Sequence, residues 1–294
     1  MCSIIVFWVI ALIVLAVIAY CFFGWIGVVG IIIILVVSWL SKPKETTKED
    51  TKDTPQALRQ ENAQVNIPVK RDTEFLNEIA SIPSAEIVLG GPKISARTLD
   101  DLPSIKFNNI TIKTNLNTIS DYVVVDIETT GVTPDSKIVE LSAIRFENFQ
   151  PVEKFSTLIN PECAIPWQAT IVNNITDAMV ANAPKIEEVI SSYQDFIGAR
   201  TIVGHNLLFD LKFLYVAGLD FALPKQRLYD TLKLAKTVLP RTCYAGDKEK
   251  SVKNYKLGTL CDYYAINVSQ AHRACSDCLA TGKLFEKLAK AKMQ

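Results

Sequence analysis

The sequence predicts an α/β fold in which a mixed sheet is covered by helices on both faces. Between residues 121 and 160, three apolar, β-branched segments follow one another with turn residues between them, which is typical of consecutive strands. From residue 185 onward, segments with helical spacing alternate with short apolar segments. Consecutive strands followed by alternating helices and strands imply a mixed sheet between two layers of helices.

The expected elements follow in chain order. We expect strands at "YVVVDI", "KIVELSAIRFEN" and "VEKFSTLIN", and then a helix, "KIEEVISSYQDFIG", that ends at Gly198. The short strand "TIVG" precedes the helix "NLLFDLKFLYVAG", with Asn206 as its cap and Gly218 past its end. A strand, "RLYD", leads into the helix "TLKLAKTVL", which Asp230 caps. The helices "LGTLCDYYAI" and "SDCLATGKLFEKLAKA" complete the domain.

Composition sets the limits for function. The 294 residues are 49% hydrophobic, enough for one sizeable core with appendages. The formal net charge is zero, so any attraction to an anionic partner must be local. Seven cysteines without a regular framework indicate reduced thiols in a cytosolic domain.

The N-terminus predicts a membrane anchor. No charged residue occurs from Ile4 to Leu40. One helix of that length would measure about 55 Å, too long for a hydrocarbon core of about 30 Å. We therefore expect a transmembrane helical hairpin at 1–41, broken at "GWIG"; one span with a re-entrant remainder is the alternative. A cleaved signal peptide is disfavoured because no charged n-region precedes the apolar run. Lys42 and Lys44 place the rest of the chain on the cytoplasmic side.

The two segments that follow the anchor have less distinct sequence patterns. Residues 42–70 are polar and poor in aromatic side chains, which predicts a linker. Residues 71–119 are expected to form a spacer or small accessory module, with a short helix at "DTEFLNEIAS" and a strand or two at "IKFNNITIKTNL". The α/β domain is then 120–294.

Two acids interrupt the first strand. In "DYVVVDIETTG", Asp126 and Glu128 point to the same face as Val124, about 6.6 Å apart along the strand. Burial of one unpaired carboxylate is costly, and two of like sign repel. Either this end of the strand is exposed, or a cation lies beside it.

Two more acids occupy apolar helices. Asp210 lies in the first turn of its helix on a face with Phe213, and Asp277 lies on the core side of the last helix. Each also has an ordinary interpretation: the helix N-terminus favours an acid at the position of Asp210, and Asp277 is then a hydrogen-bonded buried acid.

A divalent-cation site accounts for all four acids together. Carboxylate oxygens suit magnesium or manganese, and a pair of such ions stabilises the attacking and leaving oxygens of a phosphodiester displacement. A general base is also needed. His272 enters the last helix five residues before Asp277, which suits this role. A zinc site at His272, Cys275 and Cys278 is the disfavoured alternative, because a helix points these side chains in different directions.

Three stretches carry a family resemblance. "VVVDIETTG", "VGHNLLFDLKFL" and "AHRACSDCLATGKLF" resemble the three successive motifs of the DnaQ-like 3′–5′ exonucleases, which include the proofreading epsilon subunit of bacterial DNA polymerase III. The spacing of the third motif resembles that of the DEDDh subgroup, which has a histidine base. The resemblance covers about residues 120–291 and implies the ribonuclease H-like fold.

The resemblance also implies roles for individual residues. His272 is the expected base, and the metal-binding, catalytic acids are Asp126, Glu128, Asp210 and Asp277. Asp126 is expected to bridge two ions, Mg²⁺ or Mn²⁺. The residues expected to contact the terminal nucleotide are Thr129, Thr130, Asn206 and Phe209.

The expected function is a membrane-anchored, metal-dependent 3′–5′ exonuclease that releases nucleoside monophosphates from nucleic acid, with DNA favoured over RNA. Residues 4–40 would contact the membrane, and a polymerase or repair partner would act in trans. A catalytically inactive, membrane-tethered module that binds nucleic-acid ends or protein is the alternative. Asn173-Asn174 stands where many relatives have a His-Gly pair, and cations between Lys225 and Lys256 form either a nucleic-acid patch or a solvated loop.

Overall fold

The computed structural model describes residues 68–91, 97–221, 226–239, 252–268 and 272–293. The chain divides into two compact units, Met1–Gln64 and Val65–Gln294, and every described residue belongs to the second. The predicted hairpin at 1–41 lies outside the described residues, as does the predicted linker at 42–70 apart from its last three residues. Among the described residues, no helix has both the length and the apolar character needed to span a bilayer.

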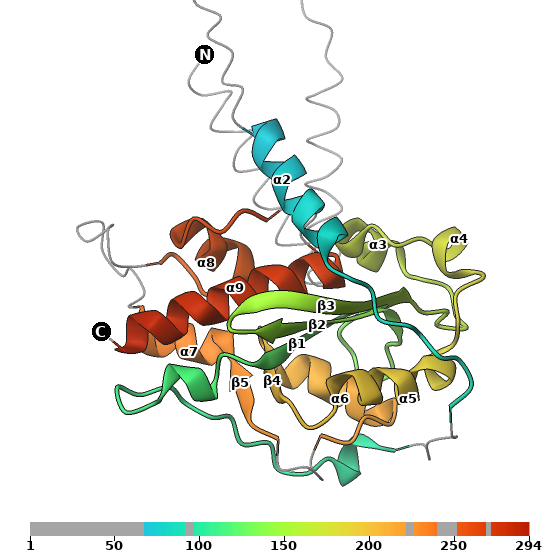
Figure 1. Cartoon of the computed structure of the whole chain (residues 1–294). Coiled ribbons are helices and arrows are strands. Elements are labelled where there is room, and N and C mark those ends of the chain that lie inside the picture. The colour runs from blue at the N-terminus through green and yellow to red at the C-terminus, as the bar shows by residue number, and fades with distance from the viewer. Residues whose placement is uncertain (1–67, 92–96, 222–225, 240–251, 269–271, 294) are drawn as a thin grey trace, which may run out of the picture. The chain divides into compact units, whose positions relative to one another are not determined.

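A mixed sheet forms the centre of the second unit (Figure 1). Its five strands lie in the order β3-β2-β1-β4-β5. β1 pairs antiparallel with β2 and parallel with β4, β2 pairs antiparallel with β3, and β4 pairs parallel with β5. The predicted mixed sheet is therefore confirmed. The strands are β1 Tyr122–Thr129, β2 Ile138–Glu147, β3 Gln150–Leu158, β4 Thr201–Gly204 and β5 Leu228–Asp230.

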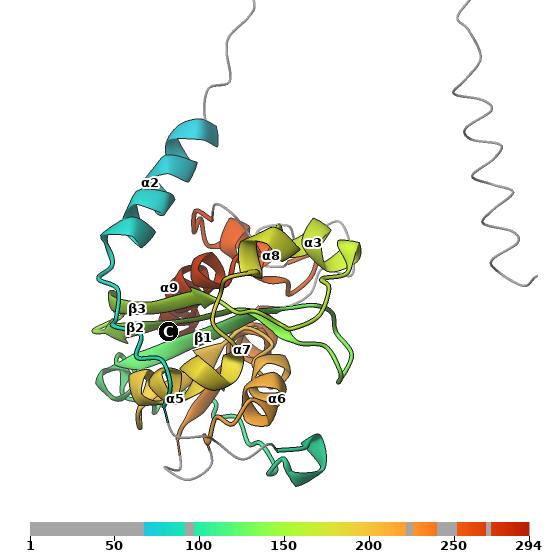
Figure 2. The same ribbon diagram turned by 90° about the vertical axis from the view of Figure 1, so that its right-hand side faces the viewer.

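Helices cover both faces of this sheet, as predicted (Figures 1 and 2). One face carries α9, with α7, α8 and α2 packed against it, and the other carries α5 and α6. The short α3 and α4 lie between β3 and α5 in the chain. The helices are α2 Pro68–Ser81, α3 Trp167–Asn173, α4 Asp177–Val180, α5 Ile186–Ile197, α6 Leu208–Val216, α7 Thr231–Val238, α8 Leu257–Tyr263 and α9 Ala274–Met293, with two 3-10 turns at Leu99–Asp101 and Leu116–Thr118.

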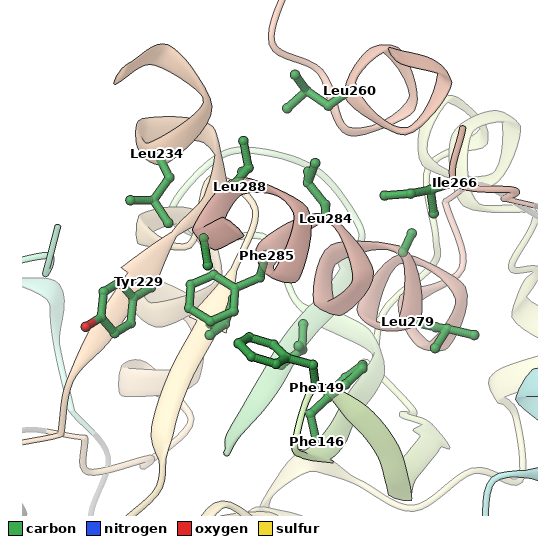
Figure 3. Packing of buried hydrophobic residues seen from close by; sticks show 14 of the residues in the cluster. Phe146, Phe149, Tyr229, Leu234, Leu260, Ile266, Leu279, Leu284, Phe285 and Leu288 are labelled. Carbon is green, nitrogen blue, oxygen red and sulfur yellow. The ribbon is translucent and has the colours of Figure 1, made fainter. Parts of the chain in front are cut away.

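The alternation of β1 divides the core into two clusters. Tyr122 and Val124 face α9, while Val123, Val125 and Ile127 face α5 and α6. On the α9 side, aromatic rings gather between the helix and the sheet, as Figure 3 shows for Phe146, Phe149, Tyr229 and Phe285. Because Asp126 and Glu128 lie two and four residues after Val124, their side chains point to the same face of β1, which α9 covers.

Residues 72–119 belong to the same compact unit as the sheet. Phe75 of α2 and Ile110 are buried in the cluster beneath α9. Asn108 exchanges hydrogen bonds with Leu228 of β5, through its backbone N–H at 2.7 Å and its side-chain oxygen at 3.0 Å. The expected spacer or small accessory module at 71–119 is corrected in this respect: its buried side chains join the core of the α/β domain.

The predicted strands at "IKFNNITIKTNL" are wrong. The structure places no strand between the 3-10 turns at Leu99–Asp101 and Leu116–Thr118, because this stretch is hydrogen-bonded to β5 at Asn108 and forms no ladder. The predicted helix at "DTEFLNEIAS" is confirmed as part of α2.

The expected helix ends are confirmed except at Asn206. Gly198 and Gly218 follow α5 and α6 with φ of +57° and +113°. Asp230 caps α7 by accepting a hydrogen bond from the Leu232 N–H at 3.0 Å. Asn206, however, is not the cap of α6: it has φ of +60°, and the helix begins after Leu207 without a side-chain cap.

Candidate active site

Three of the predicted acids meet where β1 ends beneath the start of α9. Asp126 and Glu128 come from β1, and Asp277 comes from the first turn of α9. One oxygen from each carboxylate lies within 4.8 Å of the other two. Strand alternation and helical spacing therefore bring together side chains that are about 150 residues apart in the chain.

Asp210 approaches the same end of β1 from the opposite face of the sheet. Its carboxylate is 4% exposed, and Oδ1 accepts a hydrogen bond from the Ile127 N–H at 3.2 Å. Asp210 is not among the three acids whose oxygens lie within 4.8 Å of one another. Its charge nevertheless acts on Asp126, because it is the neighbouring carboxylate that most raises the pKa of Asp126.

All four acids have raised pKa values, and burial is the largest cause at each. Burial and the surrounding carboxylates hold the pKa of Asp126 well above its usual range. They raise the pKa of Glu128 to about 8. Burial raises the pKa of Asp210 to about 8 and that of Asp277 to about 7, although hydrogen bonds from backbone N–H groups oppose both shifts. Without a cation, the surroundings of these acids therefore favour their protonated forms.

His272 lies at the mouth of this acidic group. It is exposed and stands two residues before α9, as predicted for a residue on the entering loop. Its backbone has a left-handed φ of +63°, and its N–H donates to Asp277 Oδ2 at 3.2 Å. The backbone of the expected base is thus hydrogen-bonded to one of the expected metal ligands.

Sequence reasoning missed a fifth acid, Glu140, and its partner, Arg273. Glu140 stands opposite Glu128 in the β1–β2 ladder and is 3% exposed. Arg273 donates two hydrogen bonds to it, at 2.9 and 3.1 Å. A charged residue inside the apolar strand "KIVELSAIRF" was a signal that a partner must exist, but the sequence does not identify that partner.

Two of the predicted substrate residues line a cavity of about 600 Å³. Asn206 and Phe209, from the start of α6, form part of its wall, together with the turn after β1. Phe209 also contacts the ring of Phe213, with centroids 4.9 Å apart. The two predicted threonines are held inside that turn: Thr129 Oγ1 donates to the Gly131 carbonyl, and Thr130 Oγ1 accepts from the Lys137 N–H. Thr130 is only 8% exposed.

The Asn173-Asn174 pair lies at the end of α3. Asn173 is buried, and its side-chain amide donates to the Thr129 carbonyl at 3.4 Å. Asn174 has φ of +57°, a left-handed conformation in which glycine is the most common residue and asparagine is tolerated. Replacement of a His-Gly pair by two asparagines is therefore compatible with the local backbone.

The remaining candidates have structural surroundings. His205 Nδ1 is 2.9 Å from Thr231 Oγ1, and burial lowers the pKa of His205 to about 4. The Cys278 thiol is buried and points toward the Val124 and Ser142 carbonyls, away from a zinc site with His272. Of the predicted basic stretch between Lys225 and Lys256, residues 226–239 and 252–256 are described, and residues 225 and 240–251 are not.

The donor set suits a hard divalent cation. The converging atoms are all carboxylate oxygens, and no ion pair among the described residues neutralises Asp126, Glu128 or Asp277. Magnesium and manganese prefer such oxygen ligands, and a bound cation would offset the repulsion that raises these pKa values. The residues present therefore fit the group that the motifs imply.

Comparison with known proteins identifies the family. The sequence profile of the RNase T exonuclease family matches residues 123–285, more than half of the chain. The chain belongs to the RNase T exonuclease family. This result confirms the resemblance to the DnaQ-like 3′–5′ exonucleases, and the matched segment contains all four acids and His272.

The similar proteins differ in how much of their own length this chain covers. The PolC-type DNA polymerase III of Bacillus cereus is 34% identical over 174 residues, and that of Bacillus subtilis is 36% identical over 175 residues. Each alignment covers 58% of this chain but only 11% of the relative. A solved structure of Exonuclease X with 5′ overhanging duplex DNA is 27% identical, with a TM-score of 0.43, and the match covers 57% of this chain and 91% of that one.

Proposed function

We propose that this chain is a metal-dependent 3′–5′ exonuclease that hydrolyses nucleic acid from its 3′ end to nucleoside monophosphates. The observation that carries the proposal is the convergence of Asp126, Glu128 and Asp277, with carboxylate oxygens within 4.8 Å, beside the exposed His272. Family membership supports the reaction class. DNA is favoured over RNA because the similar PolC-type proteins are named as DNA polymerases.

Each polar residue has a distinct task in this reaction. Asp126, Glu128, Asp210 and Asp277 would hold two divalent cations, Mg²⁺ or Mn²⁺. When bound, such ions stabilise the charge on the attacking and leaving oxygens of the phosphodiester. His272 accepts the proton of the attacking water, because an imidazole can take up a proton at neutral pH and this side chain is open to solvent.

The cavity walled by Asn206 and Phe209 receives the terminal nucleotide. None of the four acids lines this cavity, and its link to them along the chain is Asp210, which directly follows Phe209. Phe209 offers an apolar face to the base, and Asn206 offers an exposed amide to the sugar or phosphate. Thr129 and Thr130 act mainly through the backbone turn that they stabilise, since both hydroxyls are engaged within it. The last phosphodiester would then extend from this cavity to the carboxylates.

An end-labelled oligonucleotide tests the proposal directly. In magnesium, a 3′ label should leave first, as a mononucleotide, and EDTA should stop its release. His272→Ala should lower turnover by about 10²- to 10⁴-fold, the usual scale for general acid–base catalysis. Binding of 3′ ends by the wild type without cleavage in magnesium or manganese would instead favour the inactive binding module.

The apolar N-terminus is the basis for proposing that the chain is anchored in a membrane. Residues 4–40 lack charge and are followed by Lys42 and Lys44, which favours a membrane anchor with the nuclease domain on the cytoplasmic side. A proofreading role would need a polymerase or repair partner in trans. Full-length chain in membranes should resist extraction by alkaline carbonate, and protease added to sealed inverted vesicles should reach the nuclease domain. Release by carbonate would exclude the anchor.

A further inference from the structure

The ion pair between Glu140 and Arg273 lies beside the active site but contributes none of its expected ligands. Glu140 is on the face of β2 next to Glu128, close enough to raise the pKa of Asp277. Both of its oxygens are already occupied: Oε1 by Arg273, and Oε2 by Arg273 and by the Ala274 N–H at 3.0 Å. Both oxygens of Glu140 are therefore engaged by the segment that enters α9.

Stability does not explain this pair. The Glu140 side chain is 4% exposed, whereas the carboxylate of the Arg145–Glu153 pair on the same sheet is 34% exposed. Desolvation of a buried ion pair costs about as much as the attraction returns, and an apolar pair is often as stable. Such a pair instead fixes the relative position of the two segments that carry it.

The segments joined here are β2 and the entry to α9. Glu140 holds Arg273 and Ala274, which directly follow His272, while the His272 N–H is held by Asp277. His272 has a left-handed φ of +63°, which costs a non-glycine residue energy and persists only where its surroundings enforce it. The contacts on either side of His272 provide that enforcement.

We propose that Glu140 and Arg273 are positioning residues, which fix the backbone of the base His272 over the carboxylates of Asp126, Glu128 and Asp277. The inference rests on the proposed nuclease function. A displacement of about 1 Å in a reacting group can cost about 10²-fold in rate, so loss of this support reduces turnover more than substrate binding.

Steady-state kinetics of the full-length chain test the positioning role. Glu140→Gln and Arg273→Met should each lower kcat by about 10- to 100-fold and leave KM within about twofold. Arg273→Lys keeps the charge but loses the two-pronged contact, so its kcat should lie between those of wild type and Arg273→Met. The matched control is Glu153→Gln, the same change in an arginine-paired glutamate of the neighbouring strand, and its kcat should equal that of wild type.

Two double-mutant cycles separate positioning from electrostatics and from general destabilisation. The double variant Glu140→Gln/Arg273→Met should have a kcat no lower than that of the poorer single variant. In a His272→Ala background, Arg273→Met should cause no further loss of kcat. Additive losses in that background would overturn the proposal. Opposite effects of Glu140→Gln and Arg273→Met on kcat would also overturn it, since they would assign the pair a purely electrostatic role.

A spectroscopic measurement tests the placement without using activity. The chain has only two histidines, so labelled imidazoles give two NMR signals. In Glu140→Gln, the His272 signal should shift or broaden while the His205 signal stays as in wild type. An unchanged His272 signal would overturn the proposal. Inactivity of the wild type would instead count against the proposed nuclease function, and the NMR measurement would still test whether Glu140 positions His272.

Discussion

α9 packs on β1 at two places with opposite chemistry. At the apolar end, Tyr122 and Phe285 pack edge to face with ring centroids 4.9 Å apart, and Tyr122 stacks on Phe146 at the same distance. At the acidic end, Asp126, Glu128 and Asp277 bring carboxylate oxygens within 4.8 Å. The two ends share one strand and one helix.

The comparison shows how packing at one end of a helix–strand contact can offset the free-energy cost of buried carboxylates at the other end. The apolar end buries large rings completely and so stabilises the contact between helix and strand. The acidic end opposes folding, because burial and like charge both favour protonated acids there. The rigid apolar end therefore holds the acids together at a distance that they would not adopt alone.

Asp126→Asn should produce the largest effect on function. It removes the central carboxylate with almost no change in shape, so cleavage should fall by at least about 10³-fold, beyond the usual loss for one transition-state hydrogen-bond donor. In EDTA the variant should be no less stable than wild type, because asparagine is neutral without taking up a proton and cannot repel the other acids. Magnesium should raise the melting temperature of wild type by mass action and that of the variant much less.

Melting curves of both proteins in EDTA and in magnesium measure this difference. If Asp126→Asn melts well below wild type in EDTA yet retains the full magnesium shift, Asp126 is a structural acid and the acidic end has been misassigned.

Phe285→Ala should produce the converse result at the apolar end. The ring is fully buried against Tyr122 and Tyr229, so its removal should lower the free energy of unfolding by about 3–5 kcal/mol. Turnover per folded molecule should stay close to wild type below the melting temperature, since the ring packs in the apolar cluster beneath α9. Chemical denaturation and kinetics on the same preparation give both values; a large loss of kcat in fully folded protein would show that the two ends are coupled.

The pH dependence of stability should come from the acidic end. Its acids have folded-state pKa values above their ordinary ones, about 7 for Asp277 and about 8 for Glu128 and Asp210. The folded state therefore holds protons that the unfolded chain releases from about pH 4 upward. Their contribution to stability is present below that pH and is lost as the pH rises to about 8.

Melting temperatures of the wild type in EDTA should thus fall between pH 5 and pH 8, and those of Asp126→Asn, which has one fewer acid of raised pKa, should fall less. Magnesium binds the deprotonated acids, so its stabilisation should grow over the same range. A flat difference between the two proteins in EDTA would argue against buried, mutually repelling carboxylates.

Local patterns in the sequence predicted most of this site. Alternation placed Asp126 and Glu128 on one face of β1, and helical spacing placed Asp277 on the core side of α9; both placements are confirmed. The entry of His272 from a loop is confirmed as well. These predictions succeeded because strand and helix periods are local properties.

What the sequence could not predict depends on distant partners. Arg273 reaches Glu140 across 133 residues of chain, and no local pattern names that contact. The alternating stretch at 105–116 lacks a neighbour for a ladder, so its period did not produce a strand. Asn206 resembles a helix cap in sequence, but its left-handed backbone is held by Asp230 Oδ1, which accepts its N–H at 3.0 Å. The roles of the substrate residues and the anchor at 4–40 stay predictions.

Gly282→Ala should produce the smallest effect, and its sign tests how tightly the apolar end is packed. A methyl group at this position of α9 would lie 2.1 Å from Cζ of Phe146, whose ring is buried and stacked on Tyr122. Overpacking costs about 1–3 kcal/mol, and the higher helix propensity of alanine returns about 1 kcal/mol, so the net change should be a loss of no more than about 2 kcal/mol. The matched control is Gly258→Ala in α8, where nothing lies within 4 Å of the added methyl and a small gain is expected. Denaturation midpoints of the two variants should therefore move in opposite directions. A stabilising Gly282→Ala would show that Phe146 yields readily, and that the apolar end is a looser support for the acids than its ring geometry indicates.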